Sequence, residues 1–173
     1  PVLMHGGLLG WFWSGKPFPW DDDLDFCLLY EDLRHLDGQS SRELGYDDLN
    51  YLFEINPNHL DRTTANGHWK ENQEKNKIDA RFIHRDTGLF IDITALAPED
   101  DLLVTKCPHR YRVEDLLPLA EVDFCGTKVH VPANPQAVLT QEYGWEALTE
   151  PIFRDWVFDC FMRDWTKNKP QAP

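Results

Sequence analysis

Two aspartates separated by one residue, Asp23 and Asp25, are the side chains in this sequence best placed for chemistry. Residues two apart in a β-strand point to the same face of a sheet, so an extended segment here would present two carboxylates side by side. Carboxylates in that position repel each other, and a bound divalent cation is the simplest relief. The spacing therefore predicts a site for a divalent metal ion.

A third aspartate, Asp92, stands alone in the apolar, β-branched segment 89–94. A carboxylate in a core strand is costly unless it is paired, exposed at one face or bound to a metal. Three carboxylates from neighbouring strands can hold two metal ions, which clamp the attacking and leaving oxygens of a phosphoryl transfer. We therefore expect Asp23, Asp25 and Asp92 to be catalytic residues and metal ligands. The expected cofactor is Mg²⁺ or Mn²⁺, because these hard cations prefer oxygen ligands.

Glycines and basic residues supply candidates for phosphate binding. Gly6 and Gly7 follow a short apolar run, and at a glycine turn the backbone N–H groups can approach a phosphate without a Cβ in the way. Lys77 and Arg81 lie four apart, on one face of an extended segment, and Asp79 between them can orient Arg81. We expect these glycines and basic residues to contact the phosphates of a donor. An ion-paired surface strand is the alternative for the basic segment.

The acidic run 21–25 has other interpretations. Its spacing matches the start of an EF-hand calcium loop, but Phe26 stands where that loop needs glycine. An Asp-rich helix start, stabilised by the helix dipole, is a second, although the residues that follow are too uniformly apolar for a surface helix. A glycosyltransferase with an Asp-x-Asp pair is the third. Trp20 and Asp79 are further candidates for contact with donor or acceptor, and a core position is the alternative for Trp20.

The composition fits one folded domain and excludes a basic nucleic-acid binder. The chain has 173 residues, 42% of them hydrophobic, and a formal net charge of -13. Such acidity argues against a protein that grips nucleic-acid phosphates through a basic face. No apolar run approaches the roughly 18–20 residues that span a bilayer. We expect one domain over residues 1–166, with a disordered tail over 167–173.

The four cysteines are widely spaced and form no C-x-x-C pair, which argues against a structural zinc site. Two disulfides or four buried free thiols are both compatible with their number. No histidine pair has the spacing typical of a metal site.

The elements that must position these residues form an α+β pattern. The expected strands are residues 2–7, 21–29, 49–55, 78–84, 89–93, 121–124 and 128–131. The expected helices are residues 8–13, 32–36, 134–143 and 153–165. Asn134 suits the cap of its helix, Pro135 the first turn and Gly144 the end. Residues 58–77 are polar, and we expect a long functional loop there.

The order and spacing of these motifs resemble the LicD/fukutin family, whose members look like polymerase-β-type nucleotidyltransferases. The matching segments are residues 5–10 (HGGLLG), 18–25 (FPWDDDLD), 76–83 (NKIDARFI), 87–94 (TGLFIDIT), 131–135 (VPANP) and 142–144 (EYG). Residues 76–94 are similar to the fungal branch, which includes proteins required for mannosylphosphate transfer to cell-wall glycans. The resemblance covers about residues 2–150. It implies a nucleotidyltransferase-like mixed sheet flanked by helices, with an added β-hairpin and C-terminal helices.

The resemblance also implies an activity. A phosphate-linked group, mannose phosphate, would pass from GDP-mannose or a CDP-linked donor to a glycan hydroxyl. One metal ion would hold the donor diphosphate, the other would lower the pKa of the acceptor hydroxyl, and an aspartate would take its proton. Gly7 stands where many relatives carry Ser or Thr, which removes one hydroxyl contact to phosphate.

Some members of the family are described as activators, so a non-catalytic role beside a partner transferase is an alternative that the resemblance leaves open. It implies the lumen of the Golgi or of another secretory compartment. Membrane attachment would come only through a segment outside these residues. The helix that precedes the first strand in relatives would also lie outside them.

Overall fold

The computed structural model describes residues 1–173 except 48, 58, 60–76, 108 and 169–173. Within that part of the chain, the main sheet has the order β1-β2-β5-β4-β3, and β6 and β7 extend it from β5. The bounds are β1 Val2–Leu3, β2 Asp23–Leu29, β3 Tyr51–Ile55, β4 Ala80–His84, β5 Phe90–Glu99, β6 Leu102–Val104 and β7 Arg110–Arg112. Strands β2 and β5 are parallel, whereas the other described neighbours are antiparallel. The expectation of an α+β fold with a mixed sheet is confirmed.

Helices cover both faces of this sheet. Their bounds are α1 His5–Ser14, α2 Tyr30–Leu36, α3 Val113–Leu116, α4 Pro135–Tyr143 and α5 Glu146–Thr149. Neighbouring residues of β5 point to opposite faces, and they fall in two different buried clusters. Leu96 belongs to the cluster that includes Leu8 of α1 and Leu139 of α4, whereas Ala95 packs with Leu33 of α2. Helices α1 and α4 therefore cover one face, and α2 covers the other.

The predicted helix over 134–143 is confirmed. The Asn134 side chain accepts a hydrogen bond from the N–H of Ala137 at 3.2 Å, and Gly144 ends the helix. The predicted hairpin over 121–131 is also confirmed, as β8 (Ala120–Phe124) and β9 (Thr127–Val131), with Gly126 at its turn.

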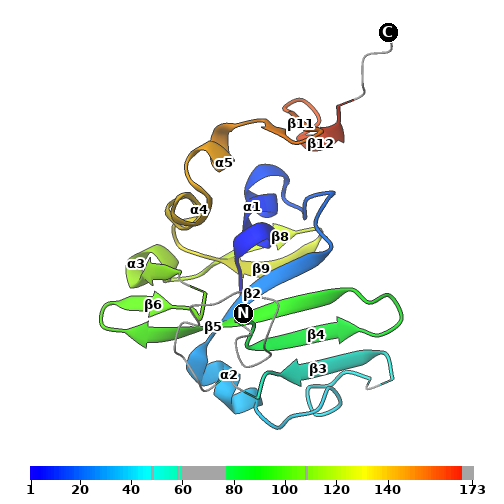
Figure 1. The fold of residues 1–173 in the computed structure, drawn as a ribbon, viewed down its shortest axis with the longest axis vertical. Coiled ribbons are helices and arrows are strands. Elements are labelled where there is room, and N and C mark those ends of the chain that lie inside the picture. Colours follow the sequence, from blue (N-terminus) through cyan, green and yellow to red (C-terminus); the bar gives the residue numbers. More distant parts are fainter. Residues whose placement is uncertain (48, 58, 60–76, 108, 169–173) are drawn as a thin grey trace.

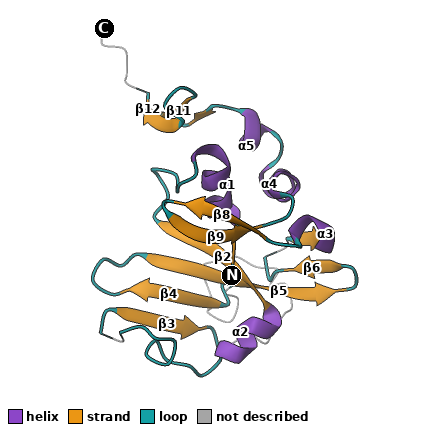
Figure 2. Ribbon diagram, turned by 180° about the vertical axis from the view of Figure 1, so that it is seen from behind, coloured by secondary structure: helices purple, strands orange, loops and turns teal. Residues whose placement is uncertain are grey.

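The expected helix over 153–165 is wrong. A small antiparallel sheet forms instead from β10 (Ile152–Phe153), β11 (Trp156–Asp159) and β12 (Asp164–Lys167), and it lies at the opposite end of the molecule from α2 (Figure 1 and Figure 2). Phe158 and Trp165 are cross-strand partners, and both rings pack against Trp13 of α1. Aromatic packing between distant segments thus outweighs the helical spacing of the apolar residues.

The glycine pair does not form a turn after a strand. Strand β1 ends at Leu3, and α1 begins at His5, so Gly6 and Gly7 lie in the first turn of that helix. The N–H of Leu8 donates to the carbonyl of Met4 at 3.1 Å. A Cβ on Gly7 would lie 2.8 Å from the Leu3 side chain, so glycine lets the helix approach the strand that precedes it.

The remaining expectations have mixed outcomes. All four cysteines are free, but only Cys27 is buried, while Cys125 and Cys160 are exposed. Strand β12 includes Lys167, and residues 169–173 of the expected tail lie outside the described residues. Most of the expected loop at 58–77 lies outside them too. In the part of the chain described, no helix combines the length and apolar character needed to cross a membrane.

The close packing of α1 makes a testable prediction about Gly10. A Cβ there would lie 2.7 Å from the carbonyl oxygen of Lys16 and 3.2 Å from the backbone nitrogen of Phe18. We expect Gly10→Ala to lower the free energy of unfolding by about 1–3 kcal/mol, because backbone must move to admit the methyl group. Urea denaturation measures this. Gly6→Ala is the control, since its Cβ would meet nothing nearer than 3.4 Å; equal stability of the two variants would contradict the account.

Candidate functional site

Strands β2 and β5 place Asp23, Asp25 and Asp92 on one face of the sheet. Asp25 and Asp92 are direct partners in the parallel register, and Asp23 lies two residues before Asp25. Partners in register point to the same face, as do residues two apart. This is the face that α1 and α4 cover, because Cys27 of β2 belongs to the same buried cluster as Leu8.

Burial and repulsion raise the pKa values of Asp25, Asp23 and Asp21. Burial raises the pKa of Asp25 to about 6, and the charges of Asp23 and Asp92 add to the effect. Burial also raises the pKa of Asp23, with help from Asp92. Asp21 joins the cluster from the segment before β2, where burial and Asp23 raise its pKa to about 6. Groups perturbed jointly by burial and specific neighbours mark candidate functional sites.

Arg81 forms a bidentate ion pair with Asp92. The guanidinium donates from Nε to Oδ1 at 2.5 Å and from Nη2 to Oδ2 at 2.8 Å. The two residues are cross-strand partners on β4 and β5, and the guanidinium lies 4.2 Å from the centre of the Phe90 ring. Asp92 is 7% exposed, so this pairing compensates a nearly buried charge.

The expectation that Asp79 orients Arg81 is wrong. Asp79 is fully buried, accepts from the N–H of Ala95 at 2.8 Å and pairs with Lys106 at 3.0 Å. These contacts fix the backbone beside β5. Lys77 precedes β4, and its positive charge acts on Cys107, whose pKa burial raises and Lys77 lowers. The positive charge beside Asp23 is that of Arg81.

The carboxylates suit Mg²⁺ or Mn²⁺ in donor chemistry, although no group of three or more His, Cys, Asp or Glu among the described residues is arranged to hold an ion. Each oxygen of Asp92 accepts one hydrogen bond from Arg81, which leaves each of them a further lone pair for a metal ion. There is space beside the other carboxylates. A Cβ on Gly6 would lie 3.4 Å from Oδ2 of Asp21 and 3.8 Å from Oδ2 of Asp25, and glycine leaves that position open.

Two cavities adjoin the acidic segment that leads into β2. One of about 340 Å³ is lined by Asp21, Asp22 and Asp23 together with aromatic rings of the main sheet, Tyr51, Phe82 and Phe90. The other, of about 480 Å³, is lined by Gly6, Trp20 and Asp21 and by aromatic residues of the C-terminal part. Both volumes are typical of small-molecule sites. Asp21 lines both cavities. It lies outside any helix or strand, so no periodic pattern in the sequence could predict this position.

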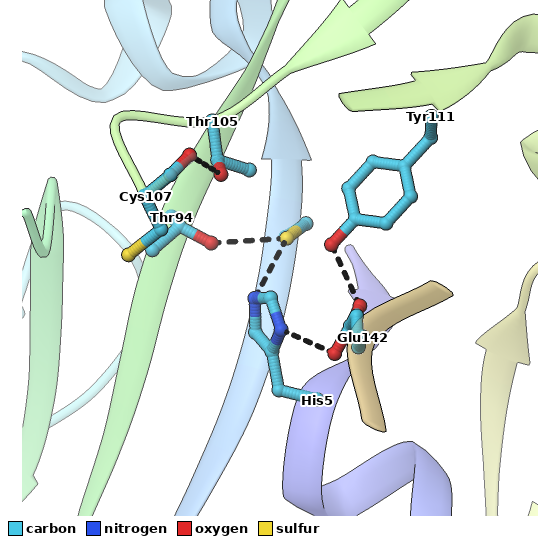
Figure 3. A network of polar contacts seen from close by, with 7 residues as sticks. His5, Thr94, Thr105, Cys107, Tyr111 and Glu142 are labelled. Atoms are coloured by element: carbon cyan, nitrogen blue, oxygen red, sulfur yellow. Dashed lines mark hydrogen bonds and ion pairs between the residues drawn. The ribbon is translucent and has the colours of Figure 1, made fainter. Parts of the chain in front are cut away.

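A buried polar network continues the carboxylate face into the core (Figure 3). His5 Nδ1 is 2.9 Å from Glu142 Oε2, and the Tyr111 hydroxyl donates to Glu142 Oε1 at 2.6 Å. Cys27 Sγ lies 3.0 Å from the hydroxyl oxygen of Thr94 and 4.0 Å from His5 Nε2. Burial alone would lower the pKa of His5, but hydrogen bonds with Cys27 and Glu142 raise it to about 11. The charged ring partly offsets the rise in the pKa of Asp25.

Comparison with known proteins identifies the family of the chain. Residues 2–134 match the family described as LicD/FKTN/FKRP, nucleotidyltransferase domain. The chain belongs to the LicD family. The chain is similar to Mannosyltransferase regulator 4 of Saccharomyces cerevisiae, at 36% identity over 123 residues, which are 66% of this chain and 10% of that protein. It is 33% identical to Mannosyltransferase regulator 14 of the same yeast over 104 residues, 57% of this chain and 10% of that protein. The chain thus spans about a tenth of each relative.

The LicD match includes some parts of the site and leaves out others. It contains the carboxylates of β2 and β5, together with Arg81 and Gly6. It ends at Asn134, so Glu142 of the polar network and the small sheet β10–β12 lie beyond it. The second cavity is therefore built partly from residues outside the family match.

The raised pKa of Asp25 makes stability depend on pH in a defined direction. The folded value is about 6 against an ordinary 3.8, so the folded state binds the proton more tightly. The charged carboxylate therefore costs stability above pH 6, and that cost disappears as the pH falls towards 4. We expect Asp25→Asn to be more stable than the wild type by about 2 kcal/mol at pH 7.5 and equal to it near pH 4.

Urea denaturation of both proteins between pH 4 and 8 measures this difference. The control is Asp86→Asn, in the exposed turn between β4 and β5, for which no such difference is expected. Lower stability of Asp25→Asn at pH 7.5 would contradict the electrostatic account.

Proposed function

We propose that this LicD domain transfers mannose phosphate from a nucleotide diphosphate donor to a hydroxyl group of a glycan, in a metal-dependent reaction. The observation that supports this most is the grouping of Asp23, Asp25 and Asp92 on one face, beside two cavities that share Asp21. Family membership supports the reaction type, and the names of the two yeast relatives support a mannose-containing substrate. GDP-mannose or a CDP-linked compound is the proposed donor.

Asp23, Asp25 and Asp92 would hold one or two Mg²⁺ or Mn²⁺ ions. When bound, such ions neutralise donor phosphates and lower the pKa of the acceptor hydroxyl. Arg81 would then exchange the carboxylate of Asp92 for a donor phosphate, since a guanidinium binds both anions in the same bidentate manner.

The glycines and Lys77 complete the proposed phosphate contacts. Gly6 offers backbone in the first turn of α1, where helix N–H groups favour anions. Gly7 is buried against Leu3 and contributes mainly to packing. Lys77, which precedes β4, remains a candidate for a more distant contact with the donor.

The two cavities suit two substrates. In the first cavity, Phe90 pairs in register with Asp23 on the carboxylate face, and its ring offers an aromatic surface to the base of a nucleotide. The acceptor hydroxyl would enter from the second cavity. Its oxygen bonds to the β-phosphorus as the bond from that phosphorus to the α-phosphate oxygen breaks. The nucleoside monophosphate leaves with that electron pair, and Asp21, which lines both cavities, takes the hydroxyl proton.

A second candidate function is regulation of a partner mannosyltransferase without catalysis. The names of the yeast relatives favour it, and so does the pairing of both Asp92 oxygens with Arg81. Metal-dependent transfer by the purified domain separates the two functions, because a regulator would show none. For either function we propose the lumen of the Golgi or of another secretory compartment, with membrane attachment through a segment outside these residues.

Removal of one carboxylate tests the catalytic proposal. We expect Asp23→Asn, and likewise Asp92→Asn, to lower transfer by about 10²–10³-fold or more, because each removes a ligand of the metal ions whose positive charge would stabilise the transition state. Phosphorus NMR of the product glycan, with several nucleotide sugars offered, measures the transfer and shows whether phosphate accompanies the sugar. Asp86→Asn is the matched control. Turnover of Asp23→Asn at the wild-type rate would contradict the assignment.

Metal binding has a readout that does not depend on activity. A ligand at ten times its dissociation constant stabilises the folded state by about 1.4 kcal/mol, which for a domain of this size raises the melting temperature by about 3–6 °C. We expect this shift with millimolar Mn²⁺ and its reversal by a chelator. In Asp23→Asn the shift should be absent. An equal shift in that variant would place the ion elsewhere.

A further inference from the structure

The second cavity, of about 480 Å³, has a wall of aromatic rings contributed by α1, the segment before β2 and the small C-terminal sheet. We propose that it binds a sugar ring of a neutral glycan, held by Trp165 and by the carboxylates of Asp21, Glu146 and Glu150. The binding of a sugar here is independent of the transfer reaction proposed above. Only the assignment of that sugar as the acceptor rests on the transfer.

The rings of the aromatic wall pack against one another. Trp165 contacts Trp13 edge-on, with ring centres 5.2 Å apart, and Trp20 in the same manner at 5.2 Å. Phe18 stacks on Trp20 at 4.5 Å and 11°. Rings fixed in this way give flat apolar surface at little cost in conformational entropy. The C–H face of a pyranose is a flat apolar surface of matching size.

The polar groups of the cavity define what else the ligand must supply. Trp165 lines the cavity and is 6% exposed, and its indole nitrogen is itself buried and has no hydrogen-bond partner within the described part of the chain. A buried donor without a partner is costly, so it calls for an acceptor oxygen. Asp21, Glu146 and Glu150 line the same cavity and call for donors instead.

Sugar hydroxyls meet both requirements, because each can donate and accept. A cationic ammonium ligand would suit the rings and the carboxylates, but it offers no acceptor to the Trp165 N–H. A phosphate offers acceptors but would meet three carboxylates of its own sign. The chemistry of the cavity therefore favours a neutral saccharide over both ions.

The position of the cavity suits an acceptor subsite. Asp21 and Gly6 line it at the end nearest the carboxylates, so a bound sugar would have a hydroxyl beside the proposed metal site. Glu146, Phe153 and Trp165 lie beyond the family match, which ends at Asn134. Residues beyond the family match would then determine which acceptor binds, next to a donor site built from residues within the match.

Titration of the protein with α-linked mannotriose tests the proposal, monitored by tryptophan fluorescence and by saturation-transfer NMR. The buffer contains a chelator and no nucleotide sugar, so the result is independent of transfer. We expect saturable binding that Trp165→Phe weakens about tenfold, because this change keeps the ring and removes the N–H. The same change also removes a buried donor that has no partner, so the melting temperature of the variant without ligand should not fall. Trp145→Phe, on a tryptophan that does not line the cavity, is the matched control.

Glu146→Gln, at the exposed rim, provides a second variant that does not disturb the aromatic core, and it should weaken binding several-fold. Tetramethylammonium is the probe for a cation site. Binding of tetramethylammonium without mannotriose would overturn the proposal, as would equal affinity of Trp165→Phe and the wild type. Saccharide binding in a protein that shows no transfer would support this proposal and refute only the catalytic one.

Discussion

The in-register parallel pairing of β2 with β5 is the constraint on which the rest of the site depends. It places Asp25 directly opposite Asp92, with Asp23 on the same face, and so gathers like charges beside buried surface. The folded state bears this cost through raised pKa values and through the pairing of Arg81 with Asp92. A site that is electrostatically costly when empty is one that cations stabilise. The grouping of these carboxylates is therefore the origin both of the electrostatic cost to the folded state and of the proposed metal site.

The buried network around Glu142 holds this arrangement in place. Glu142 of α4 bonds both His5, at the start of α1, and Tyr111 of β7, so one carboxylate joins three elements far apart in sequence. The positive charge on His5 also limits the repulsion felt by Asp25. At the other end of α1, the indole N–H of Trp13 donates to the carbonyl of Ala147. Helix α1 is thus fixed at both ends, between the proposed donor and acceptor sides.

Local patterns predicted much of the fold, and contacts between distant segments account for the errors. Alternation around Asp25 and Asp92 predicted two strands with carboxylates on one face, but β3 and β4 come between them in sequence, and spacing could not supply their register. Nearness in sequence predicts Asp79 as the partner of Arg81, yet the cross-strand register places Arg81 opposite Asp92. The segment ending at Trp165 has helical spacing, but packing on α1 makes it a sheet. The cavity that this sheet helps to line had no counterpart in the sequence analysis.

We propose that Asp23, Asp25 and Asp92 form a metal-dependent phosphate-transfer site, and that Arg81 leaves Asp92 when metal and donor bind. A crystal structure of the domain with Mn²⁺ and a non-hydrolysable nucleotide sugar, with anomalous scattering to locate manganese, tests it most directly. The account predicts manganese between Asp23, Asp25 and Asp92, and Arg81 turned from Asp92 to a donor phosphate. An intact Arg81–Asp92 ion pair with no manganese at these carboxylates would contradict it.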